Sequence, residues 1–80
     1  MAKVKITTIV AGATRTTNGG AQAISISNLG TTDCSIIDHY DNTTNLKAGA
    51  GIDLPDIGGK SYPSLTINAL ESEVLIIEIR

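Results

Sequence analysis

The chain has 80 residues, a formal net charge of −2 and only two aromatic residues, both tyrosine. This length gives one small domain, and the charge provides no basic field for nucleic acid. The longest apolar run, residues 74–77, is far shorter than the ~20 residues that cross a bilayer, and no long apolar segment of a signal peptide follows the N-terminus. We therefore expect neither nucleic acid nor a membrane as a partner.

The N-terminal quarter predicts two strands. Residues 3–10 begin with alternating polar and apolar side chains, which places Val4 and Ile6 on one face of a strand. Residues 14–17 form a weaker strand that is polar on both faces, as is typical of a sheet edge or of an arm that lies across a neighbour. Residues 1–20 are accordingly expected to be an N-terminal arm or an edge-strand segment of the same domain.

A hairpin is predicted next. Asn-Gly-Gly at residues 18–20 suits the type I′ turn that joins two paired strands. Residues 21–29 then alternate cleanly, so that Ile24 and Ile26 face the core.

The second half of the chain predicts further short strands. Residues 33–40 form a strand, and the composition of residues 41–45 favours a turn. Residues 46–55 hold one or two short strands around glycines, and residues 62–69 alternate again. Residues 73–80 end the chain as a strand that is apolar on both faces, which predicts cover on two sides, one of them by another subunit.

These elements predict an all-β fold: a small antiparallel β-sandwich, Ig-like or jelly-roll-like, with about seven short strands in a single domain over residues 1–80. Twelve Ile, three Val and ten Thr support this prediction, because β-branched side chains suit a pleated surface. The single cysteine, Cys34, cannot form an internal disulfide; it alternates in phase with Ile36 and is expected to be buried. So small a domain without a disulfide favours a homo-oligomer.

The only cluster of titratable side chains is Asp38-His39-Tyr40-Asp41. Strand alternation sends Asp38 and His39 to opposite faces, and Asp41 belongs to the turn that follows. We therefore interpret the cluster as a polar strand end and expect no catalytic residue, no metal site and no cofactor. A calcium site built from several Asp-containing loops stays open as an alternative.

The succession of turns and strands is the most informative pattern. It comprises Asn28-Leu29-Gly30, a glycine-containing segment at residues 46–55, the alternating residues 65–69 and the final strand at 74–77. Over residues 21–80 this succession resembles the small β-sandwich modules of tailed-phage virions, such as capsid decoration proteins, head-fibre bases and tail-associated domains. The resemblance implies a non-enzymatic structural subunit made in the bacterial cytoplasm. It would be located in the virion, docked on the major capsid protein or other virion proteins by strand pairing and apolar contacts.

The expected partner contacts lie on the polar second strand, on the last strand and at the two tyrosines: Thr14, Arg15, Thr16, Leu75, Ile77, Ile79, Tyr40 and Tyr62. The alternative function is that of a carbohydrate- or cell-surface-binding β-sandwich module, with or without calcium. The scarcity of aromatic side chains for stacking on sugars weighs against it.

Overall fold

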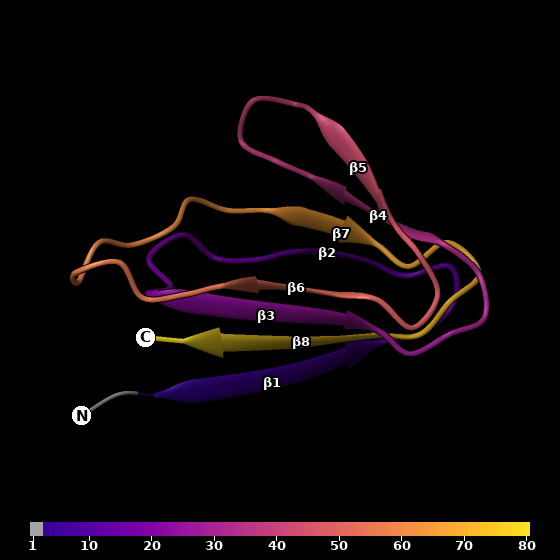
Figure 1. The fold of residues 1–80 in the computed structure, drawn as a ribbon, viewed down its shortest axis with the longest axis horizontal. Coiled ribbons are helices and arrows are strands. Elements are labelled where there is room, and N and C mark those ends of the chain that lie inside the picture. The colour runs from indigo at the N-terminus through magenta and orange to yellow at the C-terminus, as the bar shows by residue number, and fades with distance from the viewer. Residues whose placement is uncertain (1–2) are drawn as a thin grey trace.

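Two four-stranded antiparallel sheets face each other in a computed structural model of the chain, which describes residues 3–80 (Figure 1). The strands are β1 (Val4–Ile9), β2 (Thr14–Thr16), β3 (Ala23–Asn28), β4 (Cys34–Ile37), β5 (Thr43–Leu46), β6 (Gly51–Leu54), β7 (Thr66–Asn68) and β8 (Val74–Ile79). The first sheet has the order β1-β8-β3-β6 and the second has the order β2-β7-β4-β5. The all-β antiparallel sandwich predicted from the sequence is confirmed.

The connections follow the jelly-roll pattern. Consecutive strands mostly alternate between the two sheets, and β4 with β5 is the one consecutive pair that hydrogen-bonds directly within the part of the chain described. This order is that of an eight-stranded jelly roll, so the jelly-roll alternative holds rather than the Ig-like one. Since residues 3–80 form no helix, they contain none long and apolar enough to cross a membrane.

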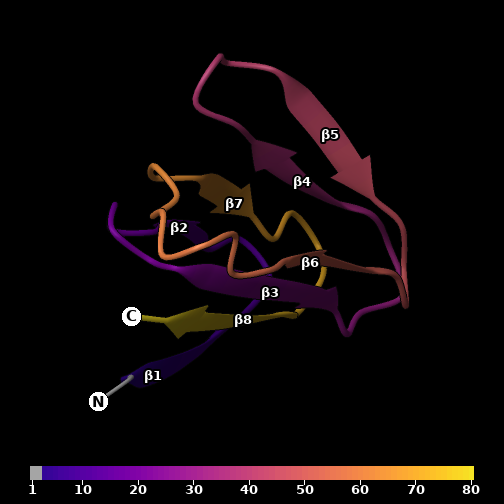
Figure 2. The same cartoon turned by 60° about the vertical axis from the view of Figure 1, so that its left-hand side comes forward.

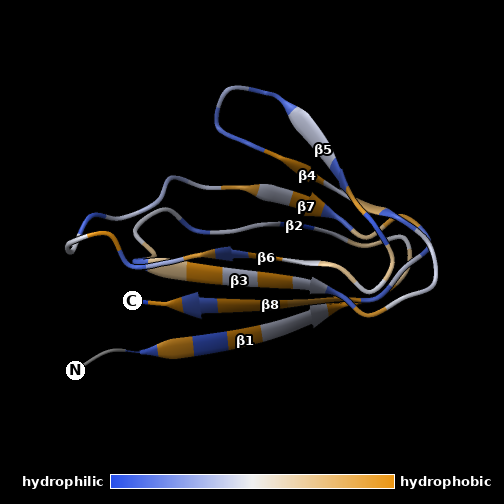
Figure 3. Cartoon of the chain, in the orientation of Figure 1, coloured by the Kyte–Doolittle hydropathy of each residue, from blue (hydrophilic) through white to orange (hydrophobic). Residues whose placement is uncertain are grey.

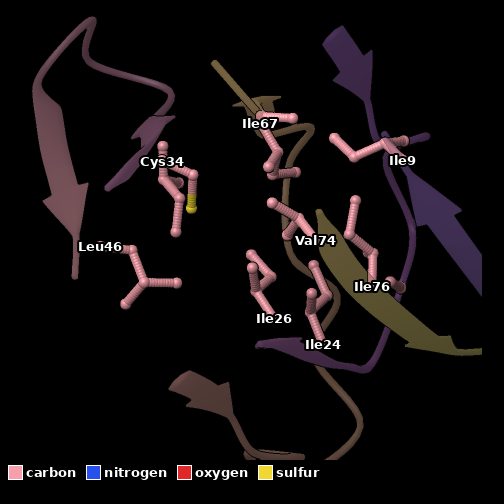
Figure 4. Close-up of a cluster of buried hydrophobic side chains, with 11 residues drawn as sticks. Ile9, Ile24, Ile26, Cys34, Leu46, Ile67, Val74 and Ile76 are labelled. Atoms are coloured by element: carbon pink, nitrogen blue, oxygen red, sulfur yellow. The ribbon is translucent and has the colours of Figure 1, made fainter. Parts of the chain in front are cut away.

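The core lies between the sheets and is built from alternate positions of the strands (Figure 4). Ile24 and Ile26 of β3 are buried as predicted, and Ile67 of β7 meets them from the other sheet. Cys34 is also fully buried, in phase with Ile36. Each buried aliphatic side chain contributes about 1.5–3 kcal/mol to folding, so these alternating positions hold the two layers together.

The prediction of a hairpin with its turn at residues 18–20 is wrong. β2 belongs to the second sheet, where Thr16 pairs with Thr66, whereas β3 lies in the first sheet between β8 and β6. Both edges of β3 are therefore occupied, and the connection crosses from one sheet to the other. Of the predicted turn residues, Gly20 alone has a positive φ, of 102°.

The strand predicted at residues 33–40 is shorter than expected, and the turn predicted at 41–45 contains a strand. β4 ends at Ile37, and the chain reverses over residues 38–42 into β5. β5 is exposed apart from Leu46, and its exposed residues are polar. This polar composition is the reason why the sequence predicted a turn here. β5 is extended because it pairs along β4, with Cys34 opposite Leu46.

Candidate interaction surface

Hydrophobic residues recur along β1 and β8 of the first sheet (Figure 3), and the burial patterns of the two strands leave one set of them on the outer side of the sheet. On β1, Val4 is 61% exposed and Ile6 is 65% exposed. The register places them beside Ile79 and Ile77, which are half-buried on the same side of the sheet. We define the aliphatic face as these four residues together with Leu75 of β8: Val4, Ile6, Leu75, Ile77 and Ile79.

The other half of the same outer surface is polar. On β3, Ser25 lies next to Ile77, and its hydroxyl donates a hydrogen bond of 2.7 Å to the Asp53 carboxylate of β6. An antiparallel sheet with a solvated outer side normally carries polar residues there throughout. A contiguous aliphatic patch with a polar border is instead typical of a surface that contacts another protein.

The aliphatic face adjoins an unpaired strand edge. β1 forms one edge of the first sheet, next to β8 (Figure 2). Lys3 and Arg80 exchange two backbone hydrogen bonds, of 2.9 and 2.8 Å. Because hydrogen-bonded and non-hydrogen-bonded pairs alternate along an antiparallel ladder, the N–H and C=O groups of Val4, Ile6 and Thr8 point away from β8. The edge therefore offers backbone donors and acceptors to another strand.

Inside the sandwich, a charged pair connects the two sheets. Glu78 occupies an inward position of β8 and is fully buried; its Oε2 lies 2.8 Å from Nη2 of Arg15 on β2. Nη2 of Arg80 lies 3.8 Å from the other carboxylate oxygen, and its guanidinium also donates to the carbonyls of Asn18 and Gly19. The sequence pattern missed this arrangement because the last strand was interpreted as apolar on both faces.

Several residues predicted to contact a partner lie away from the aliphatic face. Arg15 points inward, where its guanidinium pairs with the carboxylate of Glu78. Thr14 and Thr16 are exposed on β2, in the sheet opposite the aliphatic face.

The two tyrosines are also apart from the aliphatic face in the fold. Tyr40 is 83% exposed in the β4–β5 turn, where its ring meets His39 edge to face with the centroids 6.1 Å apart. Tyr62 is half-buried against the core, and its hydroxyl donates to the carbonyl of Pro55. Of the predicted contact residues, Leu75, Ile77 and Ile79 alone belong to the aliphatic face; alternation along β1 was the signal for adding Val4 and Ile6.

The titratable cluster at residues 38–41 lies in the turn after β4, not in a strand that would send Asp38 and His39 to opposite faces. Oδ1 of Asp38 accepts hydrogen bonds from the backbone N–H groups of Tyr40 and Asn42, at 2.8 and 2.9 Å. The bond from Asn42 is the main cause that lowers the pKa of Asp38 below its ordinary value. Asp41 adopts a positive φ of 62°. Among residues 3–80, no group of three or more His, Cys, Asp or Glu side chains is placed to hold a metal ion.

One open depression of about 370 Å³ lies where the loops after β3 and β7 meet. Thr32, Asp33, Leu70 and Glu71 line it. Leu70 has a positive φ of 55° and is 44% exposed. Thr32 is held by hydrogen bonds, since its carbonyl accepts from the side chain of Asn28 and its N–H donates to the hydroxyl of Ser72. The depression has two carboxylates and no basic group among its lining residues, so its chemistry gives no ligand class.

Comparison with known proteins supports the fold alone. No protein-family model matches the sequence, and no curated protein sequence does either. A crystal structure of a cupin domain from Bordetella pertussis Tohama I is 17% identical with a TM-score of 0.54, over 99% of this chain and 79% of that one. A solution structure of a de novo designed double-stranded β-helix is 14% identical with a TM-score of 0.52, over 98% and 96% of the two chains. Both are similar in how the strands are arranged.

Proposed function

We propose that this protein is a non-enzymatic structural subunit that docks on other proteins through strand pairing and apolar contacts. The observation that carries the proposal is the aliphatic face beside the unpaired edge of β1. Val4 and Ile6 remain more than half exposed in the single chain, and burying such side chains against a partner returns about 1.5–3 kcal/mol each. Docking would remove this cost of exposure and pair the open backbone groups at the same time.

The more specific form of the proposal is a capsid decoration or auxiliary subunit of a tailed-phage virion. The resemblance of the strand-and-turn succession over residues 21–80 supports it. The jelly-roll topology is compatible with it, because viral capsid domains use this topology, as do lectin domains and cupins. In this form the partners are the major capsid protein or other virion proteins, and many copies bind one particle.

Particle composition tests the proposal. Virions are produced from the genome that encodes the chain, with the wild-type protein, Ile77→Asp or Val4→Asp supplied in its place, and the chain is quantified by mass spectrometry. We expect the wild-type protein in purified particles and at least a tenfold loss of both variants, since a carboxylate at the centre of an apolar contact is left without solvent or partner.

Thr44→Asp is the matched control, because it adds the same charge at an exposed position of β5, away from the aliphatic face. Absence of the wild-type chain from particles would reject the virion assignment. Incorporation of folded Ile77→Asp and Val4→Asp at the wild-type level would reject the aliphatic face as the docking surface. Circular dichroism of each purified variant establishes that it is folded.

A further inference from the structure

We propose that β1 pairs antiparallel with β1 of a second copy, with Ile6 of each copy opposite Ile6 of the other. The two first sheets would then form one continuous sheet through a two-fold axis at Ile6. This inference rests on the proposed function and makes a second copy the strand-pairing partner of the open edge: the unit that docks is a pair of chains, and it contacts the other virion protein through its aliphatic faces.

The choice of β1 follows from the lengths of the four sheet edges. β1 has six residues, whereas the other edge strands, β2, β5 and β6, have three, four and four. β1 also contains no Pro and no Gly. Natural proteins usually shorten or interrupt exposed edges, because a long regular edge is a template for another strand. Of the edges in the part of the chain described, β1 is the one that retains this capacity.

The backbone fits a two-fold axis at Ile6. Val4, Ile6 and Thr8 direct their N–H and C=O groups to the open side, as the hydrogen bonds between Lys3 and Arg80 determine. An antiparallel partner centred on Ile6 places these three residues at hydrogen-bonded positions, with Val4 opposite Thr8. Each such pair exchanges two backbone hydrogen bonds, so every open group of the edge finds a partner.

The side chains select the same register. On the outer side, β-branched residues face one another throughout, and such cross-strand pairs are favourable by about 0.2–1 kcal/mol each. On the inner side, Lys5 lies opposite Thr7 and Lys3 opposite Ile9, so no like charges are directly opposed. If the two-fold axis lay at Lys5 or at Val4 instead, Lys5 would face Lys5 or Lys3 of the other copy, and such opposed like charges are unfavourable. Registers shifted toward the C-terminus leave the open groups of Val4 without a strand residue opposite.

The pairing also enlarges the docking surface. In the joined sheet the two β1 strands lie between the two β8 strands, so the aliphatic faces of both copies become neighbours. The edge contact itself leaves most of each aliphatic face open, because it adds neighbours only in the plane of the sheet. A pair of chains therefore presents a double-width apolar strip to the proposed virion partner.

Disulfide trapping tests the register. Opposite residues at a hydrogen-bonded position have Cα atoms about 5.5 Å apart, within the range that a disulfide spans. We expect Ile6→Cys to form a covalent dimer under mild oxidation. Val4→Cys alone and Thr8→Cys alone should not, whereas a mixture of these two variants should cross-link. The native Cys34 is buried and does not interfere.

A proline variant tests the hydrogen bonding. Ile6→Pro removes an N–H that points away from β8, and proline is tolerated at such edge positions. We expect the folded chain to persist and its dimer dissociation constant, measured by sedimentation equilibrium, to rise at least tenfold. Thr7→Pro is the control, because the N–H of Thr7 belongs to the ladder with Ile76 and its loss should unfold the chain instead.

The outcomes separate this inference from the proposed function. No cross-link in Ile6→Cys, or equal cross-linking of all three single variants, would overturn the β1 pairing. The proposed function would still stand if the wild-type chain enters particles and Ile77→Asp does not. Register-specific cross-linking of a chain that never enters particles would support the pairing and reject the virion assignment.

Discussion

Arg15 and Glu78 connect the two sheets through the sandwich, with Nη2 of the guanidinium 2.8 Å from Oε2 of the carboxylate. The two residues come from strands at opposite ends of the chain, β2 and β8. Glu78 is fully buried, and its Oε1 makes no hydrogen bond with another described residue. Removing one partner from a buried pair leaves an uncompensated charge, whereas replacing both with apolar residues of similar volume is often neutral or stabilising.

We therefore expect strong coupling between the two positions. Arg80 stays 3.8 Å from the other carboxylate oxygen of Glu78 and compensates part of its charge. Arg15→Met alone should therefore lower the free energy of unfolding by about 3 kcal/mol, the lower end of the range for a broken buried pair, and the double variant Arg15→Met/Glu78→Leu should recover most of that loss. Urea denaturation of the two single variants and the double variant measures the coupling. Additive losses in the double variant would show that the pair does not act as a unit.

The loop after β3 depends on close packing at Gly30. A Cβ added there would lie 2.9 Å from the backbone Cα of Ser72, in the loop between β7 and β8, so the backbone of one of the two loops would have to shift. Asn28 holds the same loop, because its side chain donates to the carbonyl of Thr32 and accepts from the N–H of Gly30. Gly30→Ala should cost about 1–3 kcal/mol through overpacking.

Gly19→Ala is the matched control for Gly30→Ala. Its added Cβ would meet nothing closer than the backbone nitrogen of Ser64 at 3.9 Å, and its φ is not in the left-handed region. Thermal melting should show a fall of roughly 4–8 °C per kcal/mol for Gly30→Ala and almost none for Gly19→Ala. Equal falls in the two variants would contradict the role given to Ser72.

Alternation was sufficient to predict the core face of β3, where it identified Ile24 and Ile26 as core residues. In the last strand it placed Leu75, Ile77 and Ile79 on one face, but both faces are apolar in sequence, so it did not show that this face is the outward one. It could not predict partners, because β pairing depends on contacts between distant parts of the chain. β5 illustrates this limit, since its polar residues are extended only through pairing with β4.

Only part of the aliphatic face could be predicted from the sequence, because strand pairing could not. The last strand showed a face of aliphatic residues, but the register that sets Val4 beside Ile79 and Ile6 beside Ile77 appears only in the folded sheet. The pair of Arg15 with Glu78 spans 63 positions in the sequence. No local sequence pattern indicates that a charged side chain pointing inward from one sheet will meet a charged side chain pointing inward from the other.

Burial protects Cys34 from modification. The side chain is fully enclosed, and desolvation is the main cause that raises the pKa of its thiol above the ordinary 9.0. Because the thiolate is the reactive form, labelling with a disulfide reagent near pH 8 should be slow in the native protein. Its rate should rise with urea in step with unfolding.

An exposed cysteine at Thr44→Cys provides the comparison for Cys34, because it lies on the neighbouring strand and is open to solvent. In that variant one thiol should react at once in the absence of urea and the other only on unfolding. Rapid native labelling of the wild-type protein would show that β4 opens far more readily than its buried position indicates.

The turn at Asp38 should make stability depend on pH in the acid range. Backbone hydrogen bonding from Asn42 is the main cause that holds the pKa of Asp38 below the ordinary 3.8. A group whose pKa is lowered by folding stabilises the folded state above its unfolded pKa and loses that contribution as pH falls through its folded pKa. Asp38→Asn keeps an acceptor oxygen but removes the charge.

Wild type should therefore be more stable than Asp38→Asn by a constant margin from about pH 5 to pH 7, and the margin should vanish as pH falls below 3.8. Urea midpoints measured across this range give the margin directly. Asp41→Asn controls for net charge. It removes one negative charge from the same turn but leaves in place the hydrogen bonds that Asp38 accepts from Tyr40 and Asn42. A margin that stays unchanged down to about pH 2 would mean that the ionised carboxylate of Asp38 does not stabilise the turn.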